Sequence, residues 1–181
     1  NCDMAIGTKD GMLIRFNETD IRSMGRTAAG VRGIRLREGD EVIGMDIIRE
    51  GEEILVVTEN GYGKRTVESE YRIQSRGGYG LKTLHVTERN GSLVAMKVVD
   101  GTEDLMLITI NGILIRMDIE DISVIGRSTQ GVRLIRLSEG EYVATVAKVE
   151  KEVEEEQAQE AQDGIVGEAS STENLDEEQT E

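Results

Sequence analysis

The sequence contains no proline and no tryptophan, and its one cysteine is Cys2. A single cysteine excludes an internal disulfide and a cysteine-rich metal site, and it fits a reducing cytosol. The longest uncharged run, residues 105–115, has 11 residues and contains an Asn-Gly pair, so it is too short to span a bilayer, and we expect no signal peptide. Because aromatic residues make up only 3% of the chain, we expect a core of Val, Ile, Leu and Met, with 21 glycines supplying the turns.

Negative charge is concentrated at one end of the chain. The formal net charge is −15, and residues 150–181 hold 13 acidic residues and one basic residue. The remaining residues, 1–149, are close to neutral, at −3. High charge with few large apolar residues is typical of disorder, so we expect residues 150–181 to form a disordered acidic tail. Such a tail serves either solubility or competition, as a polyanion, for a basic surface nearby.

Residues 1–149 contain three copies of one unit, expected at about 4–48, 54–99 and 105–149. Equivalent positions are separated by 50 and then 51 residues. The repeated residues are Asp10-Gly11, Asn60-Gly61 and Asn111-Gly112; Arg15, Arg65 and Arg116; Arg26, Arg76 and Arg127; and Gly30, Gly80 and Gly131. A period of this size indicates a propeller or a solenoid, in which each small unit buries its apolar face against the next.

The residues of each copy predict about four strands and no helix. An Asn-Gly or Asp-Gly pair between two β-rich runs predicts a hairpin with a type I′ turn, which needs positive φ at both central residues. Further strands are expected at 31–36, 81–86 and 132–137, and final strands at 42–48, 93–99 and 142–149. The predicted fold is all-β, with about three four-stranded, propeller-like blades. Because closed propellers have four to eight blades, we expect the chain to be part of a longer protein.

Basic residues recur in phase with the repeat. Three segments contain no acidic residue, and we name them the first (22–37), second (71–87) and third (122–138) connectors. Equivalent segments of a radial fold would form a curved positive stripe that contacts the phosphates of double-stranded DNA and gains from counterion release. We predict these contact residues: Arg22, Arg26, Arg32, Arg35, Arg37, Lys64, Arg65, Arg72, Arg76, Lys82, Arg127, Arg133 and Arg136.

A structural alternative is that the basic residues protect exposed sheet edges from aggregation. This alternative suits Arg15, Arg65 and Arg116, which lie in the hairpins, better than it suits the connectors. Nothing in the chain predicts a base-reading helix, so we expect recognition of the DNA backbone and shape. His85 is the one histidine of the chain, and we interpret the tyrosines as packing residues. The sequence therefore predicts no nucleophile, metal site or acid–base pair.

The second connector contains the glycine-rich loop Gln74-Ser75-Arg76-Gly77-Gly78-Tyr79-Gly80. Clustered glycines allow the backbone to approach a ligand closely and can present N–H groups to an anion. Its Arg and last Gly align with the Gly-Arg-x-x-x-Gly-Val-Arg pattern of the other two connectors, at residues 25–32 and 126–133.

These motifs resemble the C-terminal domain of the DNA gyrase A subunit over residues 1 to about 149. The resemblance implies a six-bladed β-pinwheel, in which neighbouring blades exchange strands and DNA wraps around the basic perimeter. It also implies a noncatalytic domain without a cofactor, in a type IIA topoisomerase whose ATP and Mg²⁺ act elsewhere. The implied partners are double-stranded DNA, the gyrase B subunit, and the rest of the A subunit, with no membrane, in the bacterial cytoplasm at the nucleoid.

The loop departs from the family's gyrase box at Ser75 and Tyr79, where the box has basic residues. Gln74, Arg76, Gly77, Gly78 and Gly80 match it. We interpret the loop as a degenerate copy in a later blade, and the chain as the last three or so blades with the tail. Two other functions stay open: the equivalent domain of the topoisomerase IV A subunit, and a propeller-type protein-interaction module.

Overall fold

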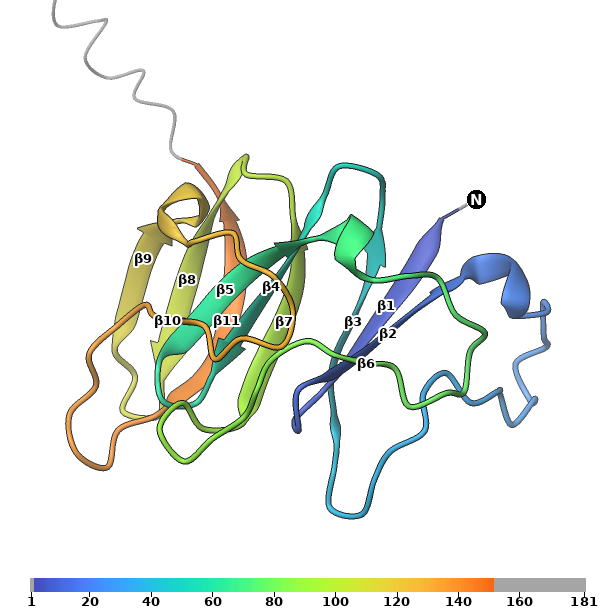
Figure 1. Ribbon diagram of the computed structural model, residues 1–181, viewed down its shortest axis with the longest axis horizontal. Coiled ribbons are helices and arrows are strands. Elements are labelled where there is room, and N and C mark those ends of the chain that lie inside the picture. The colour runs from blue at the N-terminus through green and yellow to red at the C-terminus, as the bar shows by residue number, and fades with distance from the viewer. Residues whose placement is uncertain (1, 152–181) are drawn as a thin grey trace, which may run out of the picture. The chain divides into compact units, whose positions relative to one another are not determined.

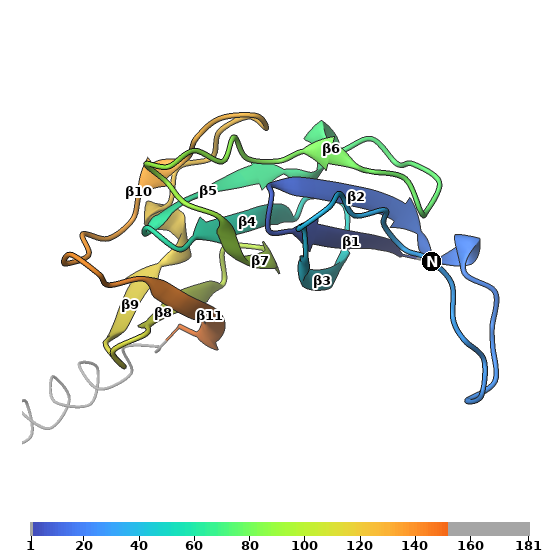
Figure 2. The same cartoon turned by 90° about the horizontal axis from the view of Figure 1, so that it is seen from below.

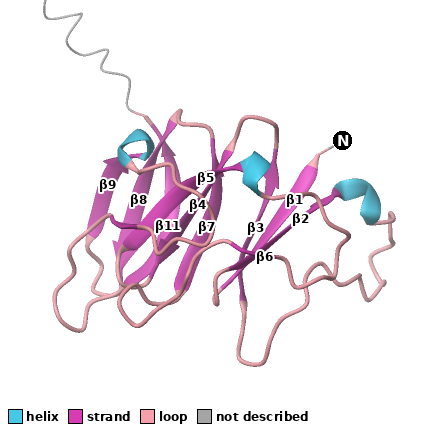
Figure 3. Cartoon of the chain, viewed as in Figure 1, coloured by secondary structure: helices cyan, strands magenta, loops and turns pink. Residues whose placement is uncertain are grey.

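The computed structural model describes residues 2–151 and consists mainly of antiparallel strands (Figures 1 and 3). Each repeat contributes a hairpin and one later strand to its own sheet, and the first hairpin strand lies between the other two. The predicted all-β fold is confirmed. The strands are β1 (Asp3–Thr8), β2 (Met12–Asn17) and β3 (Val42–Ile48); β4 (Glu53–Thr58), β5 (Tyr62–Val67) and β7 (Leu93–Val99); and β8 (Glu103–Thr109), β9 (Leu114–Asp118) and β11 (Val143–Glu150).

Neighbouring repeats exchange a short strand. Strand β6 (Leu81–Lys82) belongs to the second repeat but pairs with Met12 and Leu13 of the first sheet. Strand β10 (Val132–Arg133) belongs to the third repeat and pairs in the same way with β5 of the second sheet. Figure 2 shows β6 beside β2 and β10 beside β5. The strand exchange implied by the family resemblance is therefore present at both junctions.

The connector strands are shorter than predicted. Only two residues pair in each of β6 and β10, where six were expected, and residues 31–36 form no strand. A connector gains strand pairing only from the hairpin of the preceding repeat, and the described residues contain no hairpin before the first repeat. The third sheet, β11–β8–β9, has three strands and the other two have four, because the described residues contain no fourth repeat whose connector could pair with β9.

The hairpin turns also differ from the predicted type I′. Only the glycines have positive φ, at 80° for Gly11, 77° for Gly61 and 79° for Gly112, whereas the Asp or Asn before them does not. The N–H of Gly11 donates to Thr8 O at 3.1 Å, and the other two turns repeat this bond. This pattern is a type I turn followed by a left-handed glycine, which closes a three-residue loop with a bulge.

Two apolar layers lie between the three sheets, one on each face of the middle sheet. Alternate residues of β4 point to opposite faces, as strand geometry requires. Ile54 and Val56 pack with residues of the first sheet, and Leu55 and Val57 with residues of the third. The core is largely aliphatic, as expected, although Tyr71 and Phe16 are among its largest fully buried side chains.

A short 3₁₀ helix that was not predicted follows each hairpin. Polar side chains cap the first and third, since Asn17 accepts from Thr19 N and Asp118 accepts from Glu120 N. No helix within residues 2–151 is long and apolar enough to cross a membrane. Residues 152–181, which are most of the predicted acidic tail, lie outside the described part. The three helices are η1 (Glu18–Asp20), η2 (Glu68–Glu70) and η3 (Ile119–Asp121).

Candidate nucleic-acid interface

Repeated backbone hydrogen bonds fix the second and third connectors against the preceding repeat. At the junction of the first and second repeats, Gln74 N donates to Arg15 O at 2.8 Å. There, Arg35 N donates to Gly78 O at 2.7 Å. Because the same bonds recur one repeat later, the connectors are held in equivalent positions. The recurring pairs are Ile125 N with Arg65 O at 2.9 Å and His85 N with Thr129 O at 2.9 Å.

Most of the predicted DNA-contacting residues are exposed. None of these exposed residues forms an ion pair within residues 2–151, so each carries a charge with no carboxylate beside it. They occupy all three connectors, which are therefore positive surface segments. The nine residues are Arg22, Arg26, Arg32, Arg35, Arg37, Arg72, Lys82, Arg133 and Arg136.

Arg76 and Arg127 are only partly exposed and connect neighbouring repeats. Arg76 donates from Nη1 to Arg32 O at 3.1 Å and from Nε to Asp20 O at 3.0 Å. Arg127 donates from Nη1 to Lys82 O, which is the equivalent carbonyl one repeat later, at 3.5 Å. The repeated arginine of the connector therefore joins two repeats, and a substitution here would change the junction as well as the surface charge.

Lys64 is fully buried and does not reach the surface. Its Nζ donates to Gly126 O at 2.6 Å and to Thr129 Oγ1 at 3.0 Å, from beneath the third connector. Burial, together with the nearby Arg127 charge, lowers the pKa of the Lys64 ammonium from 10.5 to about 8. Lys64 thus supports the third connector from inside the fold, and this geometry removes it from the predicted contact set.

The hairpin arginines form ion pairs with carboxylates on the paired strands. Arg65 Nη1 lies 2.8 Å from Glu53 Oε2 on the paired strand, and its side chain is only 12% exposed. It also donates from Nε to Ile122 O at 2.8 Å in the next repeat. Arg65 is therefore also removed from the contact set. The equivalent pairs are Arg15 with Asp3 at 2.8 Å and Arg116 with Asp104 at 2.7 Å.

These acidic partners were missed, although the sequence carries a signal for them. Asp3, Glu53 and Asp104 have the same spacings of 50 and 51 residues as the arginines. Aligning acidic as well as basic residues across the repeats would have identified three pairs. It would also have separated the hairpin arginines from the connector arginines.

The glycine-rich loop packs against the first connector instead of presenting an open anion nest. Gly77 N donates to Gly33 O, so this N–H is already used. Gly80 has a φ of 76°, and a Cβ there would lie 2.5 Å from Leu13 O, so only glycine fits against β2. Tyr79 is 47% exposed, with the Arg35 guanidinium 5.4 Å from the centre of its ring. The Gly77 N–H is therefore not open to an anion, and the loop adds the exposed Tyr79 side chain to the surface.

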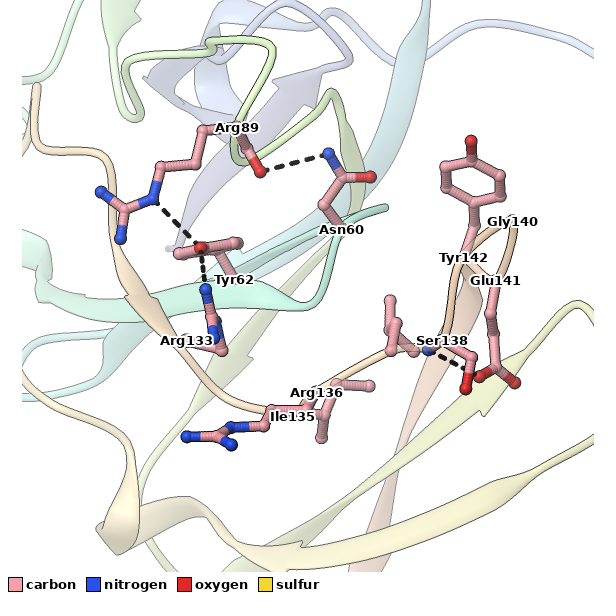
Figure 4. A pocket seen from close by; sticks show the side chains of 11 residues that line it. Asn60, Tyr62, Arg89, Arg133, Ile135, Arg136, Ser138, Gly140, Glu141 and Tyr142 are labelled. Atoms are coloured by element: carbon pink, nitrogen blue, oxygen red, sulfur yellow. Dashed lines mark hydrogen bonds between the residues drawn. The ribbon is translucent and has the colours of Figure 1, made fainter.

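A cavity of about 430 Å³ lies between the second hairpin turn and the third connector (Figure 4). Tyr62, Arg89 and Arg133 line it together with Arg136. The Tyr62 hydroxyl oxygen accepts from Arg89 Nε at 3.1 Å and from Arg133 Nη2 at 3.0 Å. Hydrogen bonding from Arg133, and then from Arg89, lowers the pKa of the Tyr62 phenol. Arg89 was not predicted, because it follows Glu88 and lies outside the acid-free second connector.

No constellation for metal binding is present in the described part of the chain. Within residues 2–151, no three His, Cys, Asp or Glu side chains are placed to hold a metal ion together. His85 is exposed, and its backbone N–H takes part in the repeated junction bonds.

The family model described as "DNA gyrase C-terminal domain, beta-propeller" matches residues 3–49, 52–100 and 103–150. These three matches cover the three repeats and most of the chain. The chain belongs to the DNA gyrase C-terminal domain family.

Relatives of this gyrase domain include the DNA gyrase A subunit of Staphylococcus epidermidis (strain ATCC 12228 / FDA PCI 1200), which is 56% identical over 154 residues. That match covers 84% of this chain and 17% of the relative. The DNA gyrase A subunit of Staphylococcus aureus (strain MRSA252) is 55% identical over 156 residues, covering 85% of this chain and 18% of the relative. The chain therefore spans less than a fifth of the length of these relatives.

Two solved structures share the fold of this gyrase domain. A DNA gyrase A C-terminal domain superposes with a TM-score of 0.76 at 27% identity, over 82% of this chain and 51% of the other. The C-terminal domain of a DNA topoisomerase IV gives a TM-score of 0.79 at 25% identity, over 91% and 51%. The fold does not separate the two enzymes, but identities of 55–56% to gyrase A favour gyrase.

Proposed function

We propose that this gyrase domain binds double-stranded DNA by its phosphate backbone and wraps it along the three connectors. The observation that carries the proposal is the set of nine exposed basic residues on the connectors, none of them ion-paired within residues 2–151. At one position the exposed charge recurs in all three connectors, as Arg32, Lys82 and Arg133. Regular positive charge along successive units suits a polyanion that follows the surface.

Arg32, Lys82 and Arg133 provide the sharpest test, because they are equivalent, exposed residues of the three connectors. Duplex DNA affinity is measured for wild type and for the triple alanine variant across a salt series. Each lost phosphate contact should flatten the slope of log K against log salt concentration by about 0.9. The triple variant should therefore flatten this slope by about 2.7. The matched control is Arg49→Ala, which removes an exposed arginine outside the connectors.

Two results would contradict the proposal. An unchanged slope in the triple variant would mean that the connectors do not contact phosphates. Basic residues would then protect edges, and the domain would fit a protein-interaction module. A slope loss of about 0.9 in Arg49→Ala, as large per charge as in the triple variant, would mean that DNA binds by net charge without using the connectors.

At the level of the whole protein, we propose that the domain presents wrapped DNA to the remainder of the gyrase A subunit. ATP hydrolysis on the gyrase B subunit would then drive negative supercoiling in the bacterial cytoplasm, at the nucleoid. The domain would cleave no DNA and need no cofactor, so EDTA should leave its DNA affinity unchanged at matched ionic strength. Cleavage or relaxation of supercoiled plasmid by the purified domain would contradict this division of labour.

A further inference from the structure

The cavity at the junction of the second and third repeats gathers three arginines from two repeats. Arg89, Arg133 and Arg136 all line this cavity and an adjoining one. Arg89 comes from the segment between β6 and β7, and the other two come from the third connector. All three are exposed, so their guanidinium groups are open to a ligand.

The positive charge of this cavity is not neutralised by the protein. None of the three arginines forms an ion pair among residues 2–151. The carboxylate that lines the cavity belongs to Glu141, which is 9% exposed. Its oxygens accept from Thr109 Oγ1 at 3.0 Å and from Ser138 N at 3.4 Å. Because no carboxylate forms an ion pair with them, these like charges favour the binding of an anion.

Tyr62 holds two of these arginines in place. Figure 4 shows Arg89 and Arg133 reaching its hydroxyl oxygen from two different segments. The two guanidinium carbons also lie 5.4 and 5.5 Å from the centre of the phenol ring. Arg89 and Arg133 each donate one N–H to the Tyr62 hydroxyl oxygen. Their other guanidinium N–H groups make no hydrogen bond to a described residue. These remaining donors suit the bidentate recognition of phosphate oxygens.

The arrangement is not a requirement of the repeated fold. Positions equivalent to Tyr62 are Met12 and Ile113, and positions equivalent to Arg89 are Gly39 and Gly140. The other junction, between the first and second repeats, is built with the same backbone bonds and without this cluster. The Tyr62–Arg89–Arg133 cluster is therefore an addition at one junction.

We propose that Tyr62, Arg89, Arg133 and Arg136 form a clamp for a single backbone phosphate of bound DNA, which fixes the duplex at this junction. This inference rests on the proposed function and deepens it. Arg89 and Arg133 contact the phosphate together, Arg136 adds charge, and Tyr62 is a positioning residue. The connectors contact the duplex along its length, whereas the clamp holds one point of it.

The test uses the full chain and a short duplex DNA across a salt series. Arg89→Ala should lower affinity about tenfold, the cost of one charge-assisted contact. Since the two clamp arginines hold one phosphate together and neither holds it alone, Arg133→Ala and the double variant Arg89→Ala/Arg133→Ala should each flatten the salt slope by about 0.9. The matched double variant Arg32→Ala/Lys82→Ala, which removes two separate connector contacts, should flatten it by about 1.8.

Tyr62→Phe tests the positioning role, because it keeps the ring and the surface charge but removes the shared acceptor. Affinity should fall severalfold with the salt slope unchanged, and the loss should largely disappear when Arg89 is already alanine. Arg89→Lys keeps the charge but loses the planar guanidinium that can donate two parallel hydrogen bonds. Its DNA affinity should therefore lie between those of Arg89→Ala and wild type. Thermal unfolding confirms that each variant is folded.

Several outcomes would overturn the clamp. A slope loss of about 1.8 in Arg89→Ala/Arg133→Ala would mean two independent contacts. Wild-type affinity in Arg89→Ala, with a normal loss in the connector pair, would remove the clamp and leave the proposed function standing. If neither pair changes binding, both fail. If inorganic phosphate saturates the cavity and Arg89→Ala leaves DNA affinity unchanged, the cavity binds a free anion and does not clamp DNA.

Discussion

At the residue scale, one residue type performs three different tasks in this chain. Exposed arginines such as Arg32 present charge, Arg76 joins two repeats, and Arg65 forms an ion pair inside a junction. The repeat pattern of the sequence predicted where these arginines lie but not which of the three roles each one has. The task depends on which segment of the neighbouring repeat packs over the side chain, and this contact is distant in sequence.

Arg65 should contribute more to stability than an exposed arginine does. Arg65→Met leaves the Glu53 carboxylate without its partner and Ile122 O without its donor, in a site where the arginine is 12% exposed. We expect a loss of about 2–4 kcal/mol in the free energy of unfolding, measured by urea denaturation. Arg49→Ala breaks an exposed pair and should cost less than about 1 kcal/mol. Equal effects would show that the junction pair is no stronger than a surface pair.

Lys64 should make stability depend on pH in alkaline solution. Its pKa is about 8 in the fold and 10.5 in the unfolded chain, so the unfolded chain binds more protons between these values. The free energy of unfolding should therefore rise with pH between about 8 and 10.5, by at most about 3 kcal/mol from this residue. Below pH 8 both states are protonated, and the full cost of burying the charge is present.

Lys64→Met removes this dependence and keeps the length of the side chain. The free energy of unfolding of the variant minus that of wild type, measured by urea denaturation, should fall by at most about 3 kcal/mol between pH 8 and pH 10.5. Subtracting the two proteins cancels the titration of the tyrosines. A constant difference across this range would mean that Lys64 keeps an ordinary pKa in the fold.

At the scale of the element, the sequence predicted the strands that pair within one repeat better than those that pair between repeats. The final strands β3 and β7 have the predicted bounds, because their partner β1 or β4 belongs to the same repeat. The three connector segments predicted as strands look alike in sequence but pair differently. Residues 31–36 form no strand, whereas 81–86 and 132–137 each contribute two strand residues. Whether they pair depends on a hairpin edge in the preceding repeat.

Gly30 and Gly80 allow the exchanged strand to be tested with a matched pair of variants. Both have positive φ, 79° and 76°, but a Cβ at Gly30 meets nothing within 4 Å, whereas at Gly80 it meets Leu13 O at 2.5 Å. Gly30→Ala should cost about 1–2 kcal/mol, from the left-handed backbone alone. Gly80→Ala should cost clearly more in urea denaturation, because β6 must move away from β2. Equal costs would show that strand exchange tolerates the displacement.

At the scale of the whole molecule, charge is divided between a nearly neutral repeat region and an acidic end. Residues 152–181 carry 12 acidic residues and no basic residue. Strand β11 ends at Glu150, and Lys151 forms an ion pair with Asp118 at 3.0 Å, so the cleanest truncation leaves Lys151 in place. The function predicted for these residues, competition with DNA for the connectors, can therefore be tested without changing the third sheet.

Deleting residues 152–181 should strengthen DNA binding, most clearly at low salt. The two proteins should converge as salt rises, because screening weakens competition between polyanions. Replacing the acidic residues by their amides in the full chain separates charge from length and should reproduce the deletion. Equal affinity at every salt concentration would limit these residues to a role in solubility.

Nuclear magnetic resonance can locate bound DNA on the domain residue by residue, which tests directly whether the connectors bind it. Backbone amide and arginine side-chain signals of the ¹⁵N-labelled chain are followed during titration with a short duplex. If DNA binds along the connectors and the clamp, the shifted signals should cluster in residues 22–37, 71–87 and 122–138 and at Arg89. This expectation would be contradicted by shifts concentrated on β9 or β11 with the three connectors unchanged.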